Sequence, residues 1–358
     1  MPHILLQPGL SVDPLLLVFI GFAVGTVGSF IGVGGGYMVT PALIVLGFPA
    51  NLAVGTDITH IVGKALVATL RHRRLGNVDF RLGLFMAVGG TAGVEVGVRI
   101  VNALKQRGDF DVIVLSCSLV VMIGISALTS WEAKRARALL ADCPDGDACP
   151  LPFAKRLQAL KLPPVIHFPK SGLSMSLWVV IASGVAGGAM AGFFGVGGGF
   201  IRVPSLVYLI GQPTILAVGT DLFEIIVSAG YGCARHAASG NVVLPAALVM
   251  LLGASVGAQI GAAATAYVNG PAVRRVLSWS VSIAAVGSAL RLTYLVTGKT
   301  LSAVDFAAKA FTIGEMVLLV AVVVGLHVCG VRASRGKPIP RVAVPFLLVR
   351  PADATRKA

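Results

Sequence analysis

The sequence predicts an all-α protein that crosses a membrane many times and consists of two homologous repeats. Three observations lead to this prediction. Hydrophobic residues make up 56% of the 358-residue chain and charged residues only 12%, and the mean hydropathy is +0.88. One water-soluble core cannot bury that much apolar surface. Long apolar runs recur along the chain, and a glycine-rich motif occurs once in each half.

Nine apolar runs are long enough to cross a bilayer, which takes about 20 helical residues. They cover residues 14–32, 52–70, 80–101, 111–130, 176–194, 214–233, 243–268, 273–297 and 306–329. Two shorter runs, 37–48 and 200–211, directly follow the glycine motifs. Each of these two is either a short crossing helix or a re-entrant helix, so we expect about 9 to 11 membrane segments.

The two halves match residue by residue. The sequence Gly-Val-Gly-Gly-Gly at 32–36 returns at 195–199, and Ala-Val-Gly-Thr-Asp at 53–57 returns at 217–221. The matches extend to a proline and to two short motifs: Pro41 and Pro204, Arg71-His72 and Arg235-His236, and Gly76-Asn77-Val78 and Gly240-Asn241-Val242. Agreement over this length predicts internal duplication and, in a membrane, a transporter-like fold whose site lies where the halves meet.

Small residues recur at every fourth position in the helices around the glycine motifs. Helices in lipid associate where missing side chains let their backbones approach closely. We therefore expect tight helix packing along four stripes: Gly21, Gly25 and Ser29; Gly89, Gly93 and Gly97; Gly184, Gly188 and Gly192; and Gly253, Gly257 and Gly261.

The net charge of +14 reflects membrane orientation rather than nucleic-acid binding, because the basic residues gather in a few connections. We expect four groups on the cytoplasmic side: Arg71, Arg73, Arg74 and Arg81; Lys134, Arg135, Arg137, Lys155, Arg156, Lys161 and Lys170; Arg274 and Arg275; and Arg332, Arg335, Lys337, Arg341, Arg350, Arg356 and Lys357. If the short runs cross, the halves are inverted and the tail is cytoplasmic. If they fold back, the halves are parallel and the tail lies outside. The nearly uncharged 235–245 connection favours inversion.

These patterns divide the chain into five parts. They are a first transmembrane repeat (1–130), a cytoplasmic linker (131–175), a second repeat (176–300), an additional transmembrane helix (301–330) and a basic cytoplasmic tail (331–358). Cys143 and Cys149 in the linker are expected to have no role, with a disulfide or a metal site as the alternatives, since a zinc site needs four ligands.

Each glycine motif is expected to interrupt a membrane helix, because so many glycines cannot hold a regular helix. We call residues 32–36 the first glycine break and residues 195–199 the second glycine break. The short helix that restarts after each break exposes amide hydrogens and a positive dipole end, both of which an anion satisfies. The predicted substrate-binding glycines are Gly34, Gly35, Gly36, Gly197, Gly198 and Gly199. The alternative is a turn that serves packing only.

Ionisable residues follow each break on the next helix. Asp57, His60 and Lys64 lie at i, i+3 and i+7, on one face, and the matching positions hold Asp221, Glu224 and Ser228. A charge at this depth costs about 2.5 to 3.5 kcal/mol on insertion scales, so these groups should face a cavity or one another. His60 and Lys64 are candidates for substrate binding, and the three acids are candidates for ion coupling or gating. Structural ion pairing is the alternative, and for the two aspartates so is helix capping.

Three more charged positions complete the candidates. Arg202 follows the second break, where Val39 stands in the first half, and its guanidinium suits an anion with several oxygens; snorkelling to the interface is the alternative. Glu95 is a candidate proton carrier, with hydrogen bonding between helices as the alternative. Glu315 is expected to pair with Lys309.

The duplicated motifs resemble those of the sulfite exporter TauE/SafE family of bacterial membrane proteins. The resemblance runs from about Leu15 to Ala266 and on to Cys329, and it rests on Gly-Val-Gly-Gly-Gly-(Tyr/Phe), the proline five positions beyond and Ala-Val-Gly-Thr-Asp, each present twice. It implies a multi-pass inner-membrane permease that exports small sulfur-containing anions such as sulfite, sulfoacetate or other organosulfonates. It does not specify which anion.

The expected function is therefore secondary anion transport by alternating access, and a passive anion channel or an importer of another small oxyanion is the alternative. Export of one negative charge gains about 2.3 kcal/mol per 100 mV, so proton coupling is possible without being required. No catalytic residue, cofactor or metal site is expected, because His-Glu-x-x-His, Gly-x-Ser-x-Gly and Walker motifs are absent from the sequence. The expected partners are a small inorganic or organic anion and the lipid bilayer, and both proton binding and a homo-oligomer are compatible with the sequence.

Overall fold

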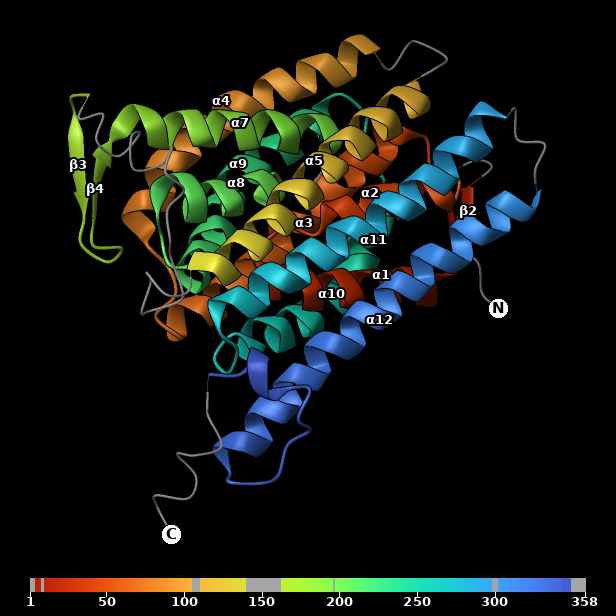
Figure 1. The fold of residues 1–358 in the computed structure, drawn as a ribbon. Coiled ribbons are helices and arrows are strands. Elements are labelled where there is room, and N and C mark those ends of the chain that lie inside the picture. Colours follow the sequence, from red (N-terminus) through yellow and green to blue (C-terminus); the bar gives the residue numbers. More distant parts are fainter. Residues whose placement is uncertain are drawn as a thin grey trace.

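The computed structural model describes residues 4–7, 10–104, 110–139, 162–195, 197–297 and 302–348, and it confirms the all-α membrane fold (Figure 1). Within these residues, eight helices are long and apolar enough to cross a membrane: α1 (Pro14–Ile31), α4 (Phe80–Leu104), α5 (Phe110–Leu139), α7 (Leu177–Phe194), α9 (Thr214–Ala238), α10 (Leu244–Ala264), α11 (Gly270–Val296) and α12 (Ser302–Ser334). Helix α3 (Ala50–Arg74) is as long as α4 but carries more charge.

Shorter elements complete the architecture. They are α2 (Gly36–Val45), α8 (Gly199–Pro204), the π-helix η1 (Ser205–Ile210), the 3₁₀ helix η2 (Val344–Phe346) and two hairpins, β1 (Ile4–Gln7) with β2 (Leu10–Val12) and β3 (Val165–Phe168) with β4 (Leu173–Ser176). The segment expected as a linker, 131–175, begins inside α5 and ends inside the β3–β4 hairpin. Cys143 and Cys149 lie outside the described residues.

Both glycine breaks interrupt the backbone as expected. Helix α1 ends at Gly32 with φ 78°, and α2 begins after Gly35 with φ 85°. In the second half, α7 ends at Gly195 with φ 72°, and α8 begins after Gly198 with φ 73°. Positive φ values are the conformation that glycine adopts at no steric cost, so the repeated glycines account for both interruptions.

Each short helix returns the chain toward the end of the bundle where the preceding helix began. The end of α2 lies beside the start of α1, because Val45 lines a small cavity with Leu16 and Ile20. Likewise, Tyr208 of η1 packs in one apolar cluster with Val180 near the start of α7. Each short segment therefore runs antiparallel to the helix that precedes it.

Glycine stripes let two pairs of helices run side by side in the same direction. A Cβ atom added to Gly89, Gly93 or Gly97 of α4 would lie 2.2 to 2.4 Å from a backbone oxygen of α7, at residues 181, 185 and 189 in turn. Gly253, Gly257 and Gly261 of α10 meet residues 18, 22 and 26 of α1 in the same way. The expected tight packing along these stripes is confirmed.

Replacing Gly188 with Ala tests this packing. Its Cβ would lie 2.0 Å from the backbone oxygen of Gly90, so α4 and α7 would have to separate. We expect a loss of about 1 to 3 kcal/mol in stability, seen as a lower thermal unfolding temperature in detergent. The control is Gly230→Ala on α9, whose Cβ would meet nothing within 4 Å and which should leave the unfolding temperature unchanged or higher. Equal unfolding temperatures for both variants would contradict the packing argument.

The two halves also make reciprocal hydrogen bonds with each other. The backbone amide of Val243 donates to Thr56 Oγ1 at 2.9 Å, and the backbone amide of Asp79 donates to Thr220 Oγ1 at 3.0 Å. These four residues match under the sequence duplication, with Thr56 equivalent to Thr220 and Asp79 to Val243. Each half therefore anchors the loop before a helix of the other half.

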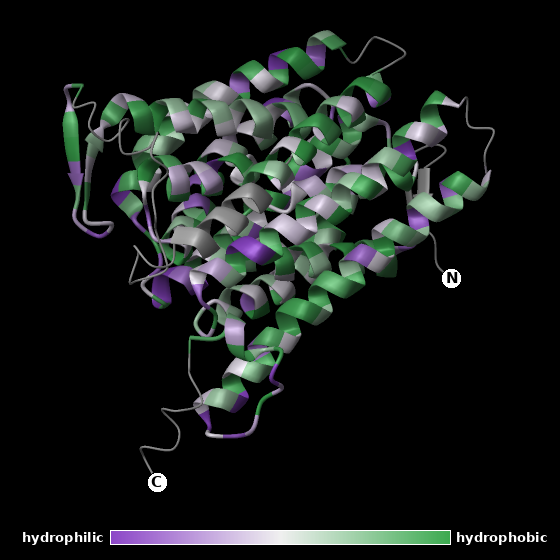
Figure 2. Ribbon diagram, viewed as in Figure 1, coloured by the Kyte–Doolittle hydropathy of each residue, from purple (hydrophilic) through white to green (hydrophobic). Residues whose placement is uncertain are grey.

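The basic connections gather at one end of the bundle. Figure 1 shows the 71–81 connection, the end of α5, the start of α11 and the segment after α12 toward the same end of the bundle, the left and lower left of the view. Hydrophilic residues concentrate there, while the outward faces of the long helices are largely hydrophobic (Figure 2). Helix α9 runs parallel to α4, because Gly219 lies beside Asn77 and, further along both helices, Glu224 lies beside Gly90. The end of α9 and the 239–243 connection after it therefore lie at the opposite end of the bundle from the 71–81 connection.

Candidate functional site

The two glycine breaks touch each other inside the bundle. A Cβ on Gly197 would lie 3.3 Å from Cα of Gly34, and one on Gly199 would lie 2.8 Å from Cα of Val33. The contact is nearly symmetric, because Gly32 faces Val218 of α9 and Gly195 faces Val54 of α3. Only glycines allow the backbones of the two breaks to approach this closely.

Six ionisable side chains surround the contact between the breaks, and we call them the ion cluster: Asp57, His60 and Lys64 from α3, Arg202 from α8, and Asp221 and Glu224 from α9. All six are completely buried. The cluster contains every ionisable residue that the sequence placed after the breaks. Buried charges are retained only when they are paired or hydrogen-bonded, so the partners of each residue define what the cluster can do.

Arg202 lies at the centre of the ion pairs. Its Nε donates to Asp221 Oδ1 at 2.6 Å and its Nη2 lies 2.7 Å from Glu224 Oε2. Nη2 also donates to the carbonyl oxygen of Gly197 in the second break. The guanidinium is fully buried, so the alternative that Arg202 snorkels to the interface is wrong.

Lys64 has the equivalent position at the first break. Its Nζ donates to the carbonyl oxygen of Gly34, which is the duplicate of Gly197. The ammonium group lies within electrostatic range of Asp57 and Asp221. Each break therefore directs one carbonyl toward a cation, although the two cations come from different positions in the repeat. The sequence predicted amide donors at the breaks and did not indicate these two carbonyl contacts.

Asp57 joins α3 to the other half through a threonine. Thr40 Oγ1 lies 2.9 Å from both Asp57 Oδ2 and the carbonyl oxygen of Phe194, at the end of α7. His60 Nδ1 lies 3.4 Å from Asp57 Oδ1. Asp57 and Asp221 lie seven residues inside α3 and α9, which begin at residues 50 and 214, so the alternative that they cap helix starts is wrong.

Several polar atoms of the ion cluster have no hydrogen-bond partner. They are His60 Nε2, Arg202 Nη1, Asp221 Oδ2 and Glu224 Oε1, while Asp57 Oδ1 and His60 Nδ1 have only each other, at 3.4 Å. A buried polar group without a partner costs about 1 to 3 kcal/mol, so this many mark a place where a further ligand would be stabilised. Three carboxyl groups face two cations, and the cluster therefore holds one excess negative charge if all are ionised and His60 is neutral.

Other expected residues lie elsewhere. Glu95 is away from the ion cluster, where it accepts hydrogen bonds from Arg235 at 2.7 Å, Arg99 at 2.7 Å and Tyr231 at 2.8 Å. For Glu95 the structure therefore shows hydrogen bonding between helices, which was the alternative to a role as proton carrier. The expected pair of Glu315 with Lys309 is wrong, because Lys309 pairs with Asp305 one turn away at 2.7 Å.

Sequence reasoning missed Thr40 and the paired histidines. Thr40 has Val203 as its duplicate, so the repeat gave no signal for it. His72 and His236 did match in the sequence, and each contacts a backbone carbonyl within its own half: Ser29 at 3.0 Å and Gly192 at 3.1 Å. The duplicated Arg-His motif therefore ties the ends of α3 and α9 to α1 and α7.

Comparison with known proteins places the chain in a family. The family model for sulfite exporter TauE/SafE matches residues 17–288. The chain is 29% identical over 260 residues to the probable membrane transporter protein YunE of Bacillus subtilis, covering 70% of this chain and 87% of that protein. A probable membrane transporter protein of Xylella fastidiosa is 29% identical over 224 residues, covering 61% and 71%.

YjnA of Bacillus subtilis, also described as a probable membrane transporter protein, is 24% identical over 251 residues, covering 68% of this chain and 87% of its own length. No solved structure gives a significant match. The match over most of the sequence, the duplicated motifs and the many apolar helices lead to one conclusion. The chain belongs to the sulfite exporter TauE/SafE family and is a multi-pass membrane transporter of the bacterial inner membrane.

Proposed function

We propose that this protein exports a small sulfur-containing anion, such as sulfite, sulfoacetate or another organosulfonate, by alternating access between its two halves. The observation that carries the proposal is the ion cluster, in which Lys64 and Arg202 are buried where the two glycine breaks touch. Buried cations and helix starts at the contact between two repeats are typical of anion sites in transporters.

We further propose that the two halves are inverted repeats. Helix α1 runs parallel to α10, and α4, the duplicate of α10, runs parallel to α7, the duplicate of α1. The reciprocal hydrogen bonds of Thr56 and Thr220 support the same relation. Rocking of one half against the other would then open the ion cluster to each side in turn. The end that carries the basic connections is assigned to the cytoplasm.

A pair of equivalent positions tests this orientation. Arg74 at the end of α3 matches Ala238 at the end of α9, and both are exposed. In a background without native cysteines, we expect Ala238→Cys to react with a membrane-impermeant maleimide on intact cells. Arg74→Cys should react only after permeabilisation. Labelling of both positions from the same side would contradict the inverted arrangement.

The anion is expected to bind to Arg202 in place of the carboxylates of Asp221 and Glu224. A sulfite or sulfonate group carries several oxygens and fits the planar fork of a guanidinium, as a carboxylate does. Arg202 Nη1 is already without a partner, and Nε and Nη2 become available when Asp221 and Glu224 move away or bind a proton. The backbone amides of the glycines in the breaks remain the predicted additional donors.

The hydrogen-bond geometry at Thr40 supports a proton on Asp57. The hydroxyl group has one hydrogen, and the carbonyl of Phe194 can only accept. The hydroxyl can donate to Asp57 Oδ2 or to the carbonyl of Phe194, each at 2.9 Å, and a proton on Oδ2 that donates to Thr40 would allow both hydrogen bonds at once. Neutral Asp57 also removes the excess negative charge of the cluster. We therefore propose that Asp57 is the site of proton coupling.

Replacing Asp57 with Asn mimics the protonated carboxyl and tests this assignment. The amide can still donate to Thr40, so the variant should fold with an unfolding temperature close to that of the native protein. We expect transport whose rate no longer changes with pH, whereas the native rate should change with pH. The measurement is anion flux in proteoliposomes across a pH series. A D57N variant with the native pH profile would exclude Asp57 as the coupling site.

The overall assignment is tested by substrate panels in proteoliposomes. Sulfite, sulfate, thiosulfate, taurine and sulfoacetate are compared at two pH values. Saturable flux that accelerates when unlabelled anion is present on the opposite side is expected for alternating access. Flux that does not saturate would favour the alternative, a passive channel, and transport of a sulfur-free oxyanion in the inward direction would favour an importer. If no anion of the panel moves or binds, the sulfur-anion assignment is wrong.

A further inference from the structure

A carboxyl group outside the ion cluster is buried in the apolar part of the molecule. Glu315 lies at the middle of α12, a helix beyond the residues matched by the family model. The residue is 5% exposed, and its Oε1 has no hydrogen-bond partner. An ionised carboxylate without a partner is costly in such surroundings, and a neutral carboxyl is much less so.

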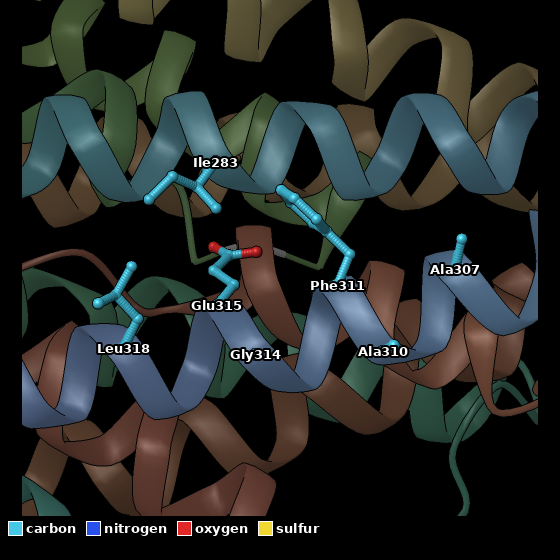
Figure 3. Close-up of a pocket in the computed structure, with 7 residues that line it drawn as sticks. All are labelled: Ile283, Ala307, Ala310, Phe311, Gly314, Glu315 and Leu318. Atoms are coloured by element: carbon cyan, nitrogen blue, oxygen red, sulfur yellow. The ribbon is translucent and has the colours of Figure 1, made fainter.

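The carboxyl lines a cavity of about 410 Å³ between α11 and α12. Figure 3 shows Glu315 pointing into the space between the two helices, flanked by Phe311 and facing Ile283. Apart from the carboxyl, the lining side chains are apolar. Leu318 on the rim is 52% exposed, and neighbouring Val317 is 51% exposed, so the cavity lies at the lipid-facing surface of the bundle.

Among the residues that the structure describes, no charged group is seen to pair with Glu315. The helices that pack against α12 are α1, α2, α10 and α11. Their sequences contain five titratable or charged residues, and four of these are on α11: Arg274, Arg275, Arg291 and Tyr294. Arg274 donates to Thr214, Arg275 lies over Phe346, and Arg291 donates to Asp305 and lies over Tyr294. The fifth is Tyr37 of α2.

The fifth residue, Tyr37, directly follows Gly36 of the first glycine break, and its hydroxyl is buried without a hydrogen-bond partner. The second half has Phe200 at the matching position. The arrangement is therefore specific to the first half and to α12.

We propose that Glu315 is a proton-binding site in the membrane, separate from the ion cluster. A proton is the ligand that fits an unpaired carboxyl with apolar surroundings. The lipid-facing cavity gives an apolar reagent access to the same group. The site differs from Asp57, which lies among charged partners, and it does not depend on the identity of the transported anion.

Dicyclohexylcarbodiimide tests this site, because it dissolves in lipid and reacts with protonated carboxyls. The carboxyl adds across one C=N bond: its oxygen bonds to the central carbon, its proton moves to a nitrogen, and nothing leaves. Transfer of the acyl group from oxygen to nitrogen then gives a stable N-acylurea. Purified protein in nanodiscs is treated at mildly acidic and mildly alkaline pH, and the modified residue is located by mass spectrometry of peptides.

We expect one carbodiimide molecule on Glu315, more at acidic than at alkaline pH, and none there in Glu315→Gln. The matched control is Asp305 on the same helix, which pairs with Arg291 at 2.6 Å and should stay unmodified. A water-soluble carbodiimide should not modify Glu315. No adduct on Glu315, an adduct independent of pH, or equal reaction with the water-soluble reagent would overturn the proposal.

The adduct is measured without any transport assay, so failure here is distinguishable from failure of the proposed export function.

Discussion

Replacing Arg202 with Gln is expected to abolish anion transport. The guanidinium makes two charged contacts, with Asp221 at 2.6 Å and Glu224 at 2.7 Å. It is also the group that we propose binds the anion in place of these carboxylates. Losing two charge-assisted contacts with the anion costs about 3 kcal/mol, which corresponds to a roughly 100-fold loss of affinity. The measurement is the concentration dependence of anion flux in proteoliposomes.

Folding must be separated from binding in this test, because the substitution leaves two buried carboxylates without their cation, a loss of about 3 to 5 kcal/mol. The control is the triple variant Arg202→Gln, Asp221→Asn, Glu224→Gln, which has a similar shape and leaves none of these three side chains charged. It should regain thermal stability and still not transport. Arg202→Lys keeps the charge without the fork and should transport weakly. Native flux from either Gln variant would contradict the account.

Replacing Gly199 with Ala is expected to have the second largest effect. The added Cβ would lie 2.4 Å from Asp221 Oδ2 and 2.8 Å from Cα of Val33, so the two breaks would be forced apart at the ion cluster. Overpacking of this kind costs about 1 to 3 kcal/mol, and a misplaced binding group reduces transport further. We expect flux to fall at least ~10-fold while most of the stability remains.

The control for Gly199→Ala is again Gly230→Ala, which adds the same methyl group to α9 in open space. It should transport at the native rate. The comparison uses flux at saturating anion together with unfolding temperature, so that a loss of function is judged against a measured loss of stability. Native flux in Gly199→Ala would show that the close contact between the breaks has no role in transport.

Much of the fold could be predicted because its causes are local in the sequence. Apolar runs gave the spans, and the glycine motifs gave the breaks at Gly32 and Gly195, where only positive φ values allow the turn. Stripes of glycine gave the helix contacts, since a missing side chain at every fourth position lies on one face. The duplication identified the equivalent residues of the two halves before their contacts were known.

The partners of the buried charges could not be predicted in the same way. The sequence placed Asp57, Lys64 and Arg202 near the breaks. Which charged groups pair with one another depends on how the two glycine breaks, one from each half, meet in space. The carbonyls of Gly34 and Gly197 carry no signal in a sequence, because every residue has one. Helix-capping and snorkelling failed as alternatives because both depend on where a residue lies within its helix and its depth in the bundle.

The most direct test of the central claim is a structure of the purified protein with a transported sulfonate or sulfite bound. The account predicts density for the anion within hydrogen-bonding distance of the Arg202 guanidinium, between residues 32–36 and 195–199, with the carboxylates of Asp221 and Glu224 displaced from it. Density for the anion at any other place, with the pairs of Arg202 intact, would contradict the account.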